Sequence, residues 1–240
     1  MSGDDAGGFQ LSLFQSWQLR QGGEALHVPL RQQRLITALA LKGPRSRSYL
    51  VGLLWPAHSE PKALDSLRVS VHLIARQVPG LLANGGAVLS LNDTVEIDLH
   101  RLHQEILQLG LGCGAGHAAA FLSDLRRADL LPGWYEDWVM AEQAEFRRAR
   151  LHALVSLAGE LFGRAEYRLA LEASEAALDL EPLYEQAVRV VVEVEQLQGN
   201  RVAALRAFEN YKARLMAEMG LVPSEALQKM VAEGVRDKGY

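Results

Sequence analysis

The first hundred residues change hydrophobic period twice. Residues 9–30 carry apolar side chains at short, roughly alternating spacing, interrupted by Gly22 and Gly23. Such a pattern is typical of short antiparallel strands joined by a tight turn. Apolar positions then follow helical spacing, which predicts a helix over residues 31–43 and a second, short helix over residues 49–55.

A third helix is predicted after Pro56. Ser59 is placed to cap it, Glu60 suits the helix dipole, and Pro61 falls in the first turn. Apolar side chains then recur in steps of three and four residues, so they form one stripe that should face the core. This stripe consists of Leu64, Leu67, Val71, Ile74 and Val78.

Alternation returns over residues 87–99, where Asn92 and Asp93 are typical turn residues and predict a β-hairpin. The predicted order is strands, three helices and a hairpin. A compact three-helix unit with a hairpin after its third helix is a winged helix. The expected first domain is therefore an α+β winged helix over residues 9–100, preceded by a disordered tail at residues 1–8.

The remainder, residues 101–240, is helical in pattern and forms the expected second domain. Residues 110–116 are glycine-rich and predict a flexible joint after a short helix at 99–109. Helices are expected at 117–127, 136–162, 166–180, 183–198, 201–219 and 223–234.

An internal repeat is visible within these helices. Residues 165–178 align with residues 199–212, so that Ala170 falls opposite Ala204 at an offset of 34 residues. This is the tetratricopeptide period, and small residues at such positions let paired helices approach closely. The pattern favours an all-α tetratricopeptide-like repeat domain, with an irregular helical bundle as the alternative.

Composition adds limits on partners and location. The chain of 240 residues is 49% hydrophobic and 22% charged, which is normal for globular domains. Through residue 100 it has nine Lys and Arg against eight Asp and Glu, and afterwards sixteen against twenty-one. The second half is thus acidic and better suited to protein partners than to nucleic acid. A single cysteine, Cys113, and the lack of a long apolar run indicate a cytoplasmic protein without a membrane segment.

Enzyme classes find no support in the sequence. There is no Walker-type loop, no G-x-G-x-x-G after a strand and no G-x-S-x-G. The seven histidines are scattered and share no metal-ligand spacing with Cys113. We therefore expect no catalytic residues, no metal and no cofactor.

Three segments together resemble one family. Residues 50–78 are similar to the second and third helices of the Streptomyces antibiotic regulatory protein (SARP) family of activators, and residues 130–154 resemble the entry to that family's bacterial transcriptional activation domain. Residues 177–227 are similar to the same domain through to its end. The more specific motifs are Leu-Trp-Pro at 54–56, Pro-Leu-Tyr-Glu at 182–185 and the closing Gly-Leu-Val-Pro-Ser at 220–224.

The resemblance implies a winged helix of the response-regulator type whose third helix enters the major groove of double-stranded DNA. It also implies protomers bound side by side on direct repeats, as a homodimer on DNA, and recruitment of RNA polymerase. The second domain would then contribute to the contacts between protomers and with the polymerase.

Candidate DNA-binding residues follow from the stripe of the third helix. If that stripe faces the core, the outward positions include Lys62, Ser66, Arg68, Val69, His72 and Arg76. Arginine can bond guanine O6 and N7 as a fork, Lys and Ser suit phosphates, and Val can touch a thymine methyl group. Arg68 is the best candidate for reading a base, and Arg45 and Arg47 in the preceding loop could contact a phosphate strand.

Some positions depart from the family's usual pattern. The matching positions at the end of the third helix hold Leu73 and Ala75 where the family is richer in arginine, and residues 84–87 have no Lys or Arg. Gln143 stands where the family often has an arginine. These departures motivate a second interpretation, a protein-interaction scaffold whose winged helix has lost strong DNA binding. A ligand-sensing concave face is a third idea without specific support.

Two further groups of residues are of interest. Arg31, Arg34 and Lys42 could supply additional phosphate contacts. The aromatic residues near the start of the second domain, Trp134, Tyr135 and Trp138, are expected to be core and domain-packing residues rather than a ligand site.

Overall fold

In the computed structural model, residues 8–109 and 115–236 are described. Residues 1–7 of the expected tail lie outside this part of the chain. The same holds for residues 110–114 of the expected joint, with Cys113 among them.

The chain divides into two compact units that are discontinuous in sequence. The first comprises Met1–Gln104 and Ala128–Ala144, and the second comprises Glu105–Arg127 and Glu145–Tyr240. Residues 128–144, which the sequence pattern assigns to the helical domain, therefore pack with the winged helix.

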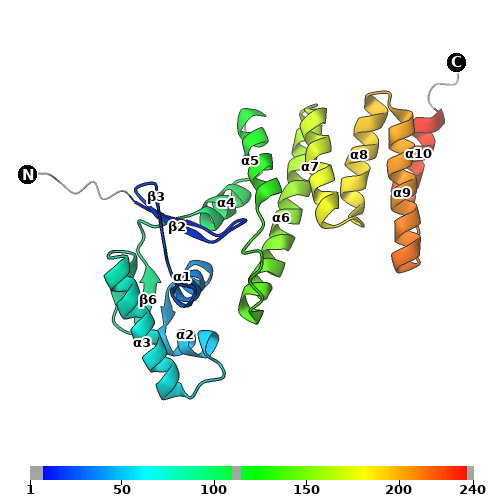
Figure 1. Cartoon of the computed structure of the whole chain (residues 1–240). Helices are drawn as coiled ribbons and strands as arrows, with labels where there is room; N and C mark the ends of the chain where they lie inside the picture. Colours follow the sequence, from blue (N-terminus) through cyan, green and yellow to red (C-terminus); the bar gives the residue numbers. More distant parts are fainter. Residues whose placement is uncertain (1–7, 110–114, 237–240) are drawn as a thin grey trace, which may run out of the picture. The chain divides into compact units, whose positions relative to one another are not determined.

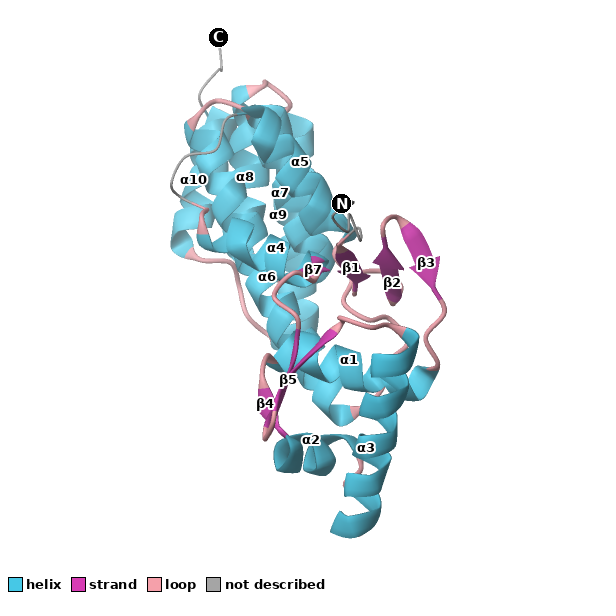
Figure 2. Cartoon of the chain, turned by 90° about the vertical axis from the view of Figure 1, so that its left-hand side faces the viewer, coloured by secondary structure: helices cyan, strands magenta, loops and turns pink. Residues whose placement is uncertain are grey.

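The first unit begins with a four-stranded sheet in the order β3-β2-β1-β7. Its strands are β1 (Phe9–Ser12), β2 (Gln18–Gln21), β3 (Glu24–Leu26) and β7 (Glu96–Ile97). β1 to β3 are antiparallel neighbours (Figure 2). Gly22 and Gly23, with φ of 56° and 87°, connect β2 and β3. Both adopt the left-handed conformation that a two-residue hairpin turn requires, which confirms the predicted turn.

Three helices follow this sheet, and a second sheet in the order β4-β6-β5 closes the unit. The helices are α1 (Leu30–Lys42), α2 (Arg47–Leu54) and α3 (Glu60–Gln77). The strands are β4 (Arg45–Ser46), β5 (Leu82–Gly85) and β6 (Val88–Leu91). The predicted α+β winged helix is present.

The position of the hairpin turn was predicted wrongly. β5 and β6 pair across Gly86, whose φ is 77°, and not across Asn92 and Asp93. At Asn92 the side chain accepts a hydrogen bond from the backbone N–H of Thr94 at 3.1 Å, a local turn that leads the chain away from β6. The following strand, β7, therefore pairs in parallel with β1.

The second unit is built from helices. They are α4 (Asp98–Leu107), α5 (Ala115–Arg127), α6 (Asp137–Gly163), α7 (Tyr167–Leu180), α8 (Glu185–Leu197), α9 (Arg201–Met219) and α10 (Glu225–Arg236). The first turns of α4 and of α6 belong to the first unit. α7, α8 and α9 lie side by side (Figure 1). Within the described ranges, no helix combines the length and apolar character needed to cross a bilayer.

The repeat positions behave as close-packing sites. Ala170 and Ala204 are both buried, at 0% and 2% exposure, so α7 and α9 present small side chains at equivalent places. A core cluster joins α8, α9 and α10, with Val192, Phe208 and Leu227 among its members. The helical-repeat architecture predicted from the period of 34 residues agrees with this packing.

Two of the motifs that carry the family resemblance meet in space. Oε2 of Glu185 accepts hydrogen bonds from the Tyr211 hydroxyl and from the backbone N–H of Ser224, each at 3.0 Å. Burial raises the pKa of Glu185, but the hydrogen bonds from Ser224 and Tyr211 outweigh it and lower the pKa below its ordinary value. The carboxylate thus ties the start of α8 to α9 and to the start of α10.

Candidate DNA-binding surface

α3 begins where the sequence predicted. Ser59 is the N-cap residue in extended conformation, and Pro61 lies in the first turn, where its missing N–H is not needed. The Ser59 side chain makes no capping hydrogen bond, so the expected hydroxyl cap is wrong. Glu60 in the first turn remains to complement the helix dipole.

The buried stripe of α3 is rotated from the predicted one. Its fully buried residues are Ala63, Leu67, Ser70 and Ile74, and Val78 follows directly after the helix. Leu64 and Val71, predicted to be core, are only half-buried. Ser70 can occupy a core position because its hydroxyl donates to the backbone carbonyl of Ser66 at 2.8 Å. The stripe places small residues, Ala63 and Ser70, where α3 packs against the rest of the unit.

This rotation leaves most of the candidate side chains on the exposed side of α3. Lys62, Arg68, Val69, His72 and Arg76 are exposed, and Ser66 is half-buried. Leu73, which stands where the family is richer in arginine, is half-buried.

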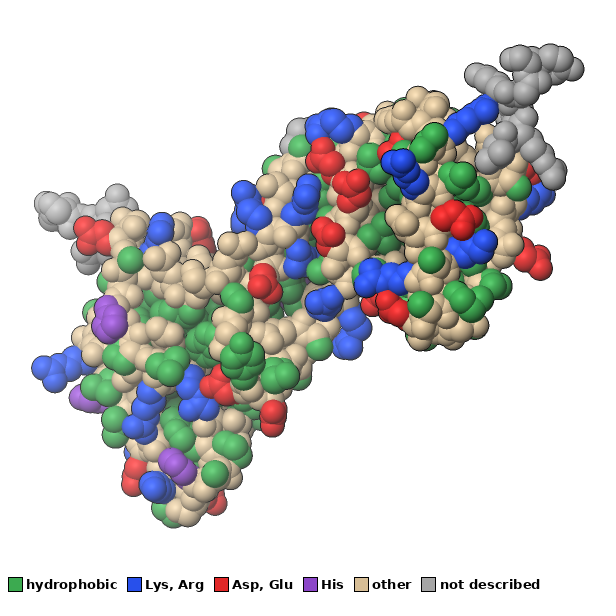
Figure 3. Space-filling view, turned by 45° about the vertical axis from the view of Figure 1, so that its right-hand side comes forward, with side chains coloured by type: hydrophobic (Ala, Val, Ile, Leu, Met, Phe, Trp, Pro, Cys, Tyr) green, Lys and Arg blue, Asp and Glu red, His purple; other side chains and the backbone are tan. Residues whose placement is uncertain are grey.

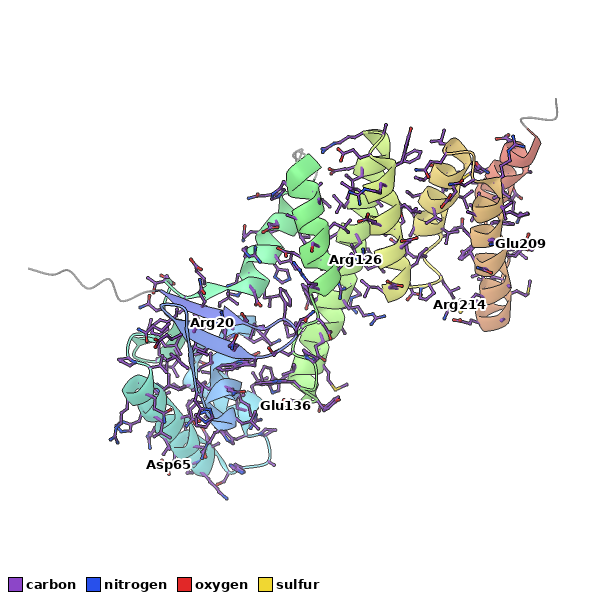
Figure 4. The ribbon with its side chains drawn as sticks, turned by 45° about the horizontal axis from the view of Figure 1, so that its top comes forward. Arg20, Asp65, Arg126, Glu136, Glu209 and Arg214 are labelled. Carbon is purple, nitrogen blue, oxygen red and sulfur yellow. The ribbon has the colours of Figure 1, made fainter. Side chains whose placement is uncertain are left out.

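Arg68 does not point into solvent without a partner. Its Nη1 lies 2.9 Å from Oδ1 of Asp65, one turn earlier on α3. Figure 4 shows the place of Asp65 on this helix. The two side chains are similarly exposed, Arg68 at 72% and Asp65 at 70%. A pair this exposed is weak, so the guanidinium can exchange Asp65 for another acceptor at small cost.

Two further arginines lie beside the β5–β6 hairpin. β4 pairs with β6 so that Arg45 is opposite Leu89. Nε of Arg47 donates to the carbonyl oxygen of Gly86 at the hairpin turn, at 3.1 Å. Arg45 stacks on the ring of Tyr49, with 5.3 Å between the guanidinium carbon and the ring centroid. The hairpin turn has no cation of its own, but Arg45 of β4 and Arg47 at the start of α2 bring positive charge to it, which hydrophobic periodicity alone did not indicate.

The cations of α1 are engaged within the unit. Nε of Arg34 lies 2.7 Å from Oε1 of Glu136, and Nη2 of Arg34 donates to the carbonyl oxygen of Leu54 at 3.1 Å. Lys42 pairs with Glu142, and Arg31 lies over the ring of Trp55. Arg34 and Lys42, considered from the sequence as phosphate contacts, instead hold the segment at 128–144.

That segment also adds backbone contacts to the winged helix. The N–H of Leu131 donates to the carbonyl of Leu13 at 2.9 Å, and the N–H of Gln15 donates to the carbonyl of Asp129 at 2.8 Å. Nε2 of Gln143 donates to the carbonyls of Leu130 and Leu131, at 3.0 and 2.8 Å. Gln143, which replaces the family's arginine, therefore organises this loop through neutral hydrogen bonds.

The expected packing of the aromatic cluster is wrong for Tyr135, which is 80% exposed. Residues 134–136 lie outside any helix or strand just before α6, and side-chain exposure alternates along them. Trp134 and Glu136 are half-buried, whereas Tyr135 between them is exposed.

Comparisons with known proteins bear on the whole chain. The profile of the bacterial transcriptional activator domain matches residues 101–233. No curated protein sequence matches the chain significantly. Among solved structures, Mycobacterium tuberculosis EmbR in complex with a low-affinity phosphopeptide is similar in fold, with a TM-score of 0.73 and 16% identity. The match covers 97% of this chain and 66% of the EmbR chain.

The profile match extends over more than half of the chain and begins where the helical pattern begins. The fold similarity covers the winged helix and the helices together. The chain accordingly belongs to the bacterial transcriptional activator domain family, as the motifs at 182–185 and 220–224 indicated.

Proposed function

We propose that this protein regulates transcription by binding a specific sequence of double-stranded DNA through α3. The observation that carries the proposal is the exposed side of α3, which gathers hydrogen-bonding and cationic side chains on the third helix of a winged helix. This surface consists of Lys62, Ser66, Arg68, Val69, His72 and Arg76.

Each side chain has a role consistent with its chemistry. Arg68 would exchange Asp65 for the O6 and N7 atoms of guanine, and Val69, 48% exposed, would contact a thymine methyl group. Lys62 and Ser66 would bind phosphates near the start of the helix. Arg45 and Arg47, beside the β5–β6 hairpin, would contact the backbone of the same duplex.

Family membership supports the wider role. We propose that the protein is a cytoplasmic activator that binds direct repeats as side-by-side protomers and contacts RNA polymerase through its helical domain. The predicted division into a DNA-binding domain at residues 9–100 and an activation domain from residue 101 enters this proposal with one change. Residues 128–144 are taken as part of the DNA-binding unit, because they pack with it.

The test is binding of the full-length protein to genomic fragments, including its own upstream region, with competitor DNA present. We expect a protected pair of direct-repeat sites. The logarithm of the affinity should fall linearly with the logarithm of the salt concentration, with about one unit of slope for each phosphate contact. A folded protein that selects no fragment even at low salt would refute the proposal.

One observation favours the scaffold interpretation as a second candidate. Asp65 offsets the charge of Arg68 at the middle of the surface, so α3 presents fewer net positive charges than its arginines suggest. A scaffold would bind every fragment equally weakly, and Arg68→Ala would leave that weak binding almost unchanged. Capture of a protein partner by a variant with Lys62, Arg68 and Arg76 all replaced by Ala would then support the scaffold.

A further inference from the structure

α9 has a second apolar stripe that no described residue covers. Its core stripe, which includes Phe208, Tyr211 and Leu215, packs against α8 and α10. On another side of the helix, four large apolar side chains are exposed: Val202 at 65%, Leu205 at 43%, Met216 at 49% and Met219 at 61%. A face of the helical unit with hydrophobic side chains exposed between charged ones is visible in Figure 3.

The exposed stripe follows coiled-coil spacing. With Glu209 and Lys212 between the apolar pairs, its positions run in steps of three and four residues: Val202, Leu205, Glu209, Lys212, Met216 and Met219. This is the alternation of two seam positions in a heptad repeat, and it lies along one line of a helix about 28 Å long. We call these six residues the α9 stripe.

The α9 stripe is complementary to a second copy of itself in antiparallel orientation. An axis between residues 210 and 211 exchanges Val202 with Met219, Leu205 with Met216 and Glu209 with Lys212. Apolar positions therefore map onto apolar positions, and the acid maps onto the base. Within one chain Nζ of Lys212 lies 3.7 Å from Oε2 of Glu209. Both side chains are about half exposed, so another molecule can also reach them. Figure 4 shows the place of Glu209 on α9.

We propose that the α9 stripe binds a second copy of this chain in antiparallel orientation, related by a two-fold axis near residues 210 and 211. In this register Val202 packs on Met219 of the partner subunit and Leu205 packs on Met216 of the partner subunit. Each Glu209 meets Lys212 of the partner subunit, so the interface contains this ion pair twice. A parallel pairing would instead place like charges opposite each other at both central positions.

Symmetry separates this contact from the one expected on DNA. Direct repeats place neighbouring protomers head to tail, whereas the α9 pair is a two-fold contact of the same surface with itself. The α9 pair therefore forms without DNA and does not depend on the proposed DNA recognition. One helix face per subunit is a small interface, so we expect a weak dimer with a dissociation constant of about 1–100 µM.

A charge-exchange series tests the pairing and its direction. Self-association of the full chain is measured by sedimentation velocity from about 1 to 500 µM, a range chosen to span the expected affinity. Glu209→Lys alone and Lys212→Glu alone each place like charges across the two-fold axis, so each should raise the dissociation constant at least about tenfold. The double variant Glu209→Lys/Lys212→Glu restores opposite charges and should recover most of the wild-type affinity.

A control uses an exposed ion pair on another helix. Lys229 and Glu233 on α10 are 3.8 Å apart and exposed, and Glu233→Lys should leave the dimer unchanged. Helix content and thermal midpoint are measured for every variant, so that a loss of dimer is not confused with unfolding. A chain that stays monomeric across the range overturns the proposal. Failure of the double exchange to recover the dimer, with all variants folded, also overturns it.

Discussion

Replacing Arg68 by Ala is the sharpest test of the α3 surface, because the structure fixes what the side chain gives up in order to bind DNA. A forked arginine–guanine contact contributes about 1–3 kcal/mol to discrimination between bases. In the free protein the guanidinium is held by Asp65 at 2.9 Å, with both side chains about 70% exposed. An exposed helix pair of this kind contributes about 0.2–0.5 kcal/mol, which the base contact must displace.

The net loss expected for Arg68→Ala is therefore about 1–2.5 kcal/mol, or a rise of about 5- to 70-fold in the dissociation constant for the specific site. Binding to unrelated DNA should change much less. The thermal midpoint should change little, because the exposed pair with Asp65 contributes only about 0.2–0.5 kcal/mol to stability. Asp65→Ala should act in the opposite direction and tighten binding to all sequences, since it removes a negative charge from the surface.

Fluorescence anisotropy with labelled operator and unrelated duplexes, at several salt concentrations, measures both effects. Arg168→Ala is the matched control, because Arg168 is a similarly exposed arginine, 76%, that pairs with Glu172 on α7 of the other unit. If Arg68→Ala changes the specific dissociation constant by less than about twofold, Arg68 does not read a base, since a forked contact cannot be that weak. The role of the α3 surface would then have to rest on its other members.

Further predictions concern the contacts that hold the two units in shape. Gln143→Ala should lower the free energy of unfolding by about 1–3 kcal/mol in urea, because it removes the side-chain amide that donates to the carbonyls of Leu130, Leu131 and Trp134; an unchanged midpoint would contradict this. Arg34→Ala should destabilise more than Glu136→Ala, since Arg34 also binds a backbone carbonyl, and a double-mutant cycle should give a coupling of about 0.5–1 kcal/mol. Burial, with the hydrogen bond to Glu185 and its charge, raises the pKa of Tyr211 to about 12. Stability from Tyr211 is thus full below its unfolded pKa of about 10 and lost as pH rises toward about 12, a dependence that urea midpoints should lack in Tyr211→Phe. Glu185 has a lowered pKa, so its contribution is present above its unfolded value and lost as pH falls; Glu185→Gln should flatten the acid limb of the same curve.

Local patterns were reliable where one short stretch of chain decides the outcome. The helices end within about two residues of their predicted positions, because the breakers and caps act on their own neighbours. The Gly22-Gly23 turn was equally local. The hairpin turn was missed since Asn92 and Gly86 both carry turn signals, and strand pairing chose between them.

Part of the candidate site could be predicted, because local periodicity decides which side chains of a helix share a face. Periodicity placed Arg68, Val69, His72 and Arg76 outward, and all of them are exposed. It did not place Ser70 in the core, because a buried hydroxyl depends on a backbone acceptor one turn away. Nor did it indicate the ion pair between Arg68 and Asp65, which depends on the rotamers that the two side chains adopt.

The sequence by itself determined the order of elements, the winged helix, the helical repeat and the family. All of these follow from the spacing of apolar residues along the chain and from short motifs. Tertiary structure alone decided which distant groups meet. It joined residues 128–144 to the first unit through Arg34 and Lys42, and it brought Glu185 to Tyr211 and Ser224. It also left the α9 stripe open, although the spacing of that stripe would equally suit a core. The physical reason is that hydrophobic period fixes which side chains share a face, whereas burial depends on what the rest of the chain places against that face.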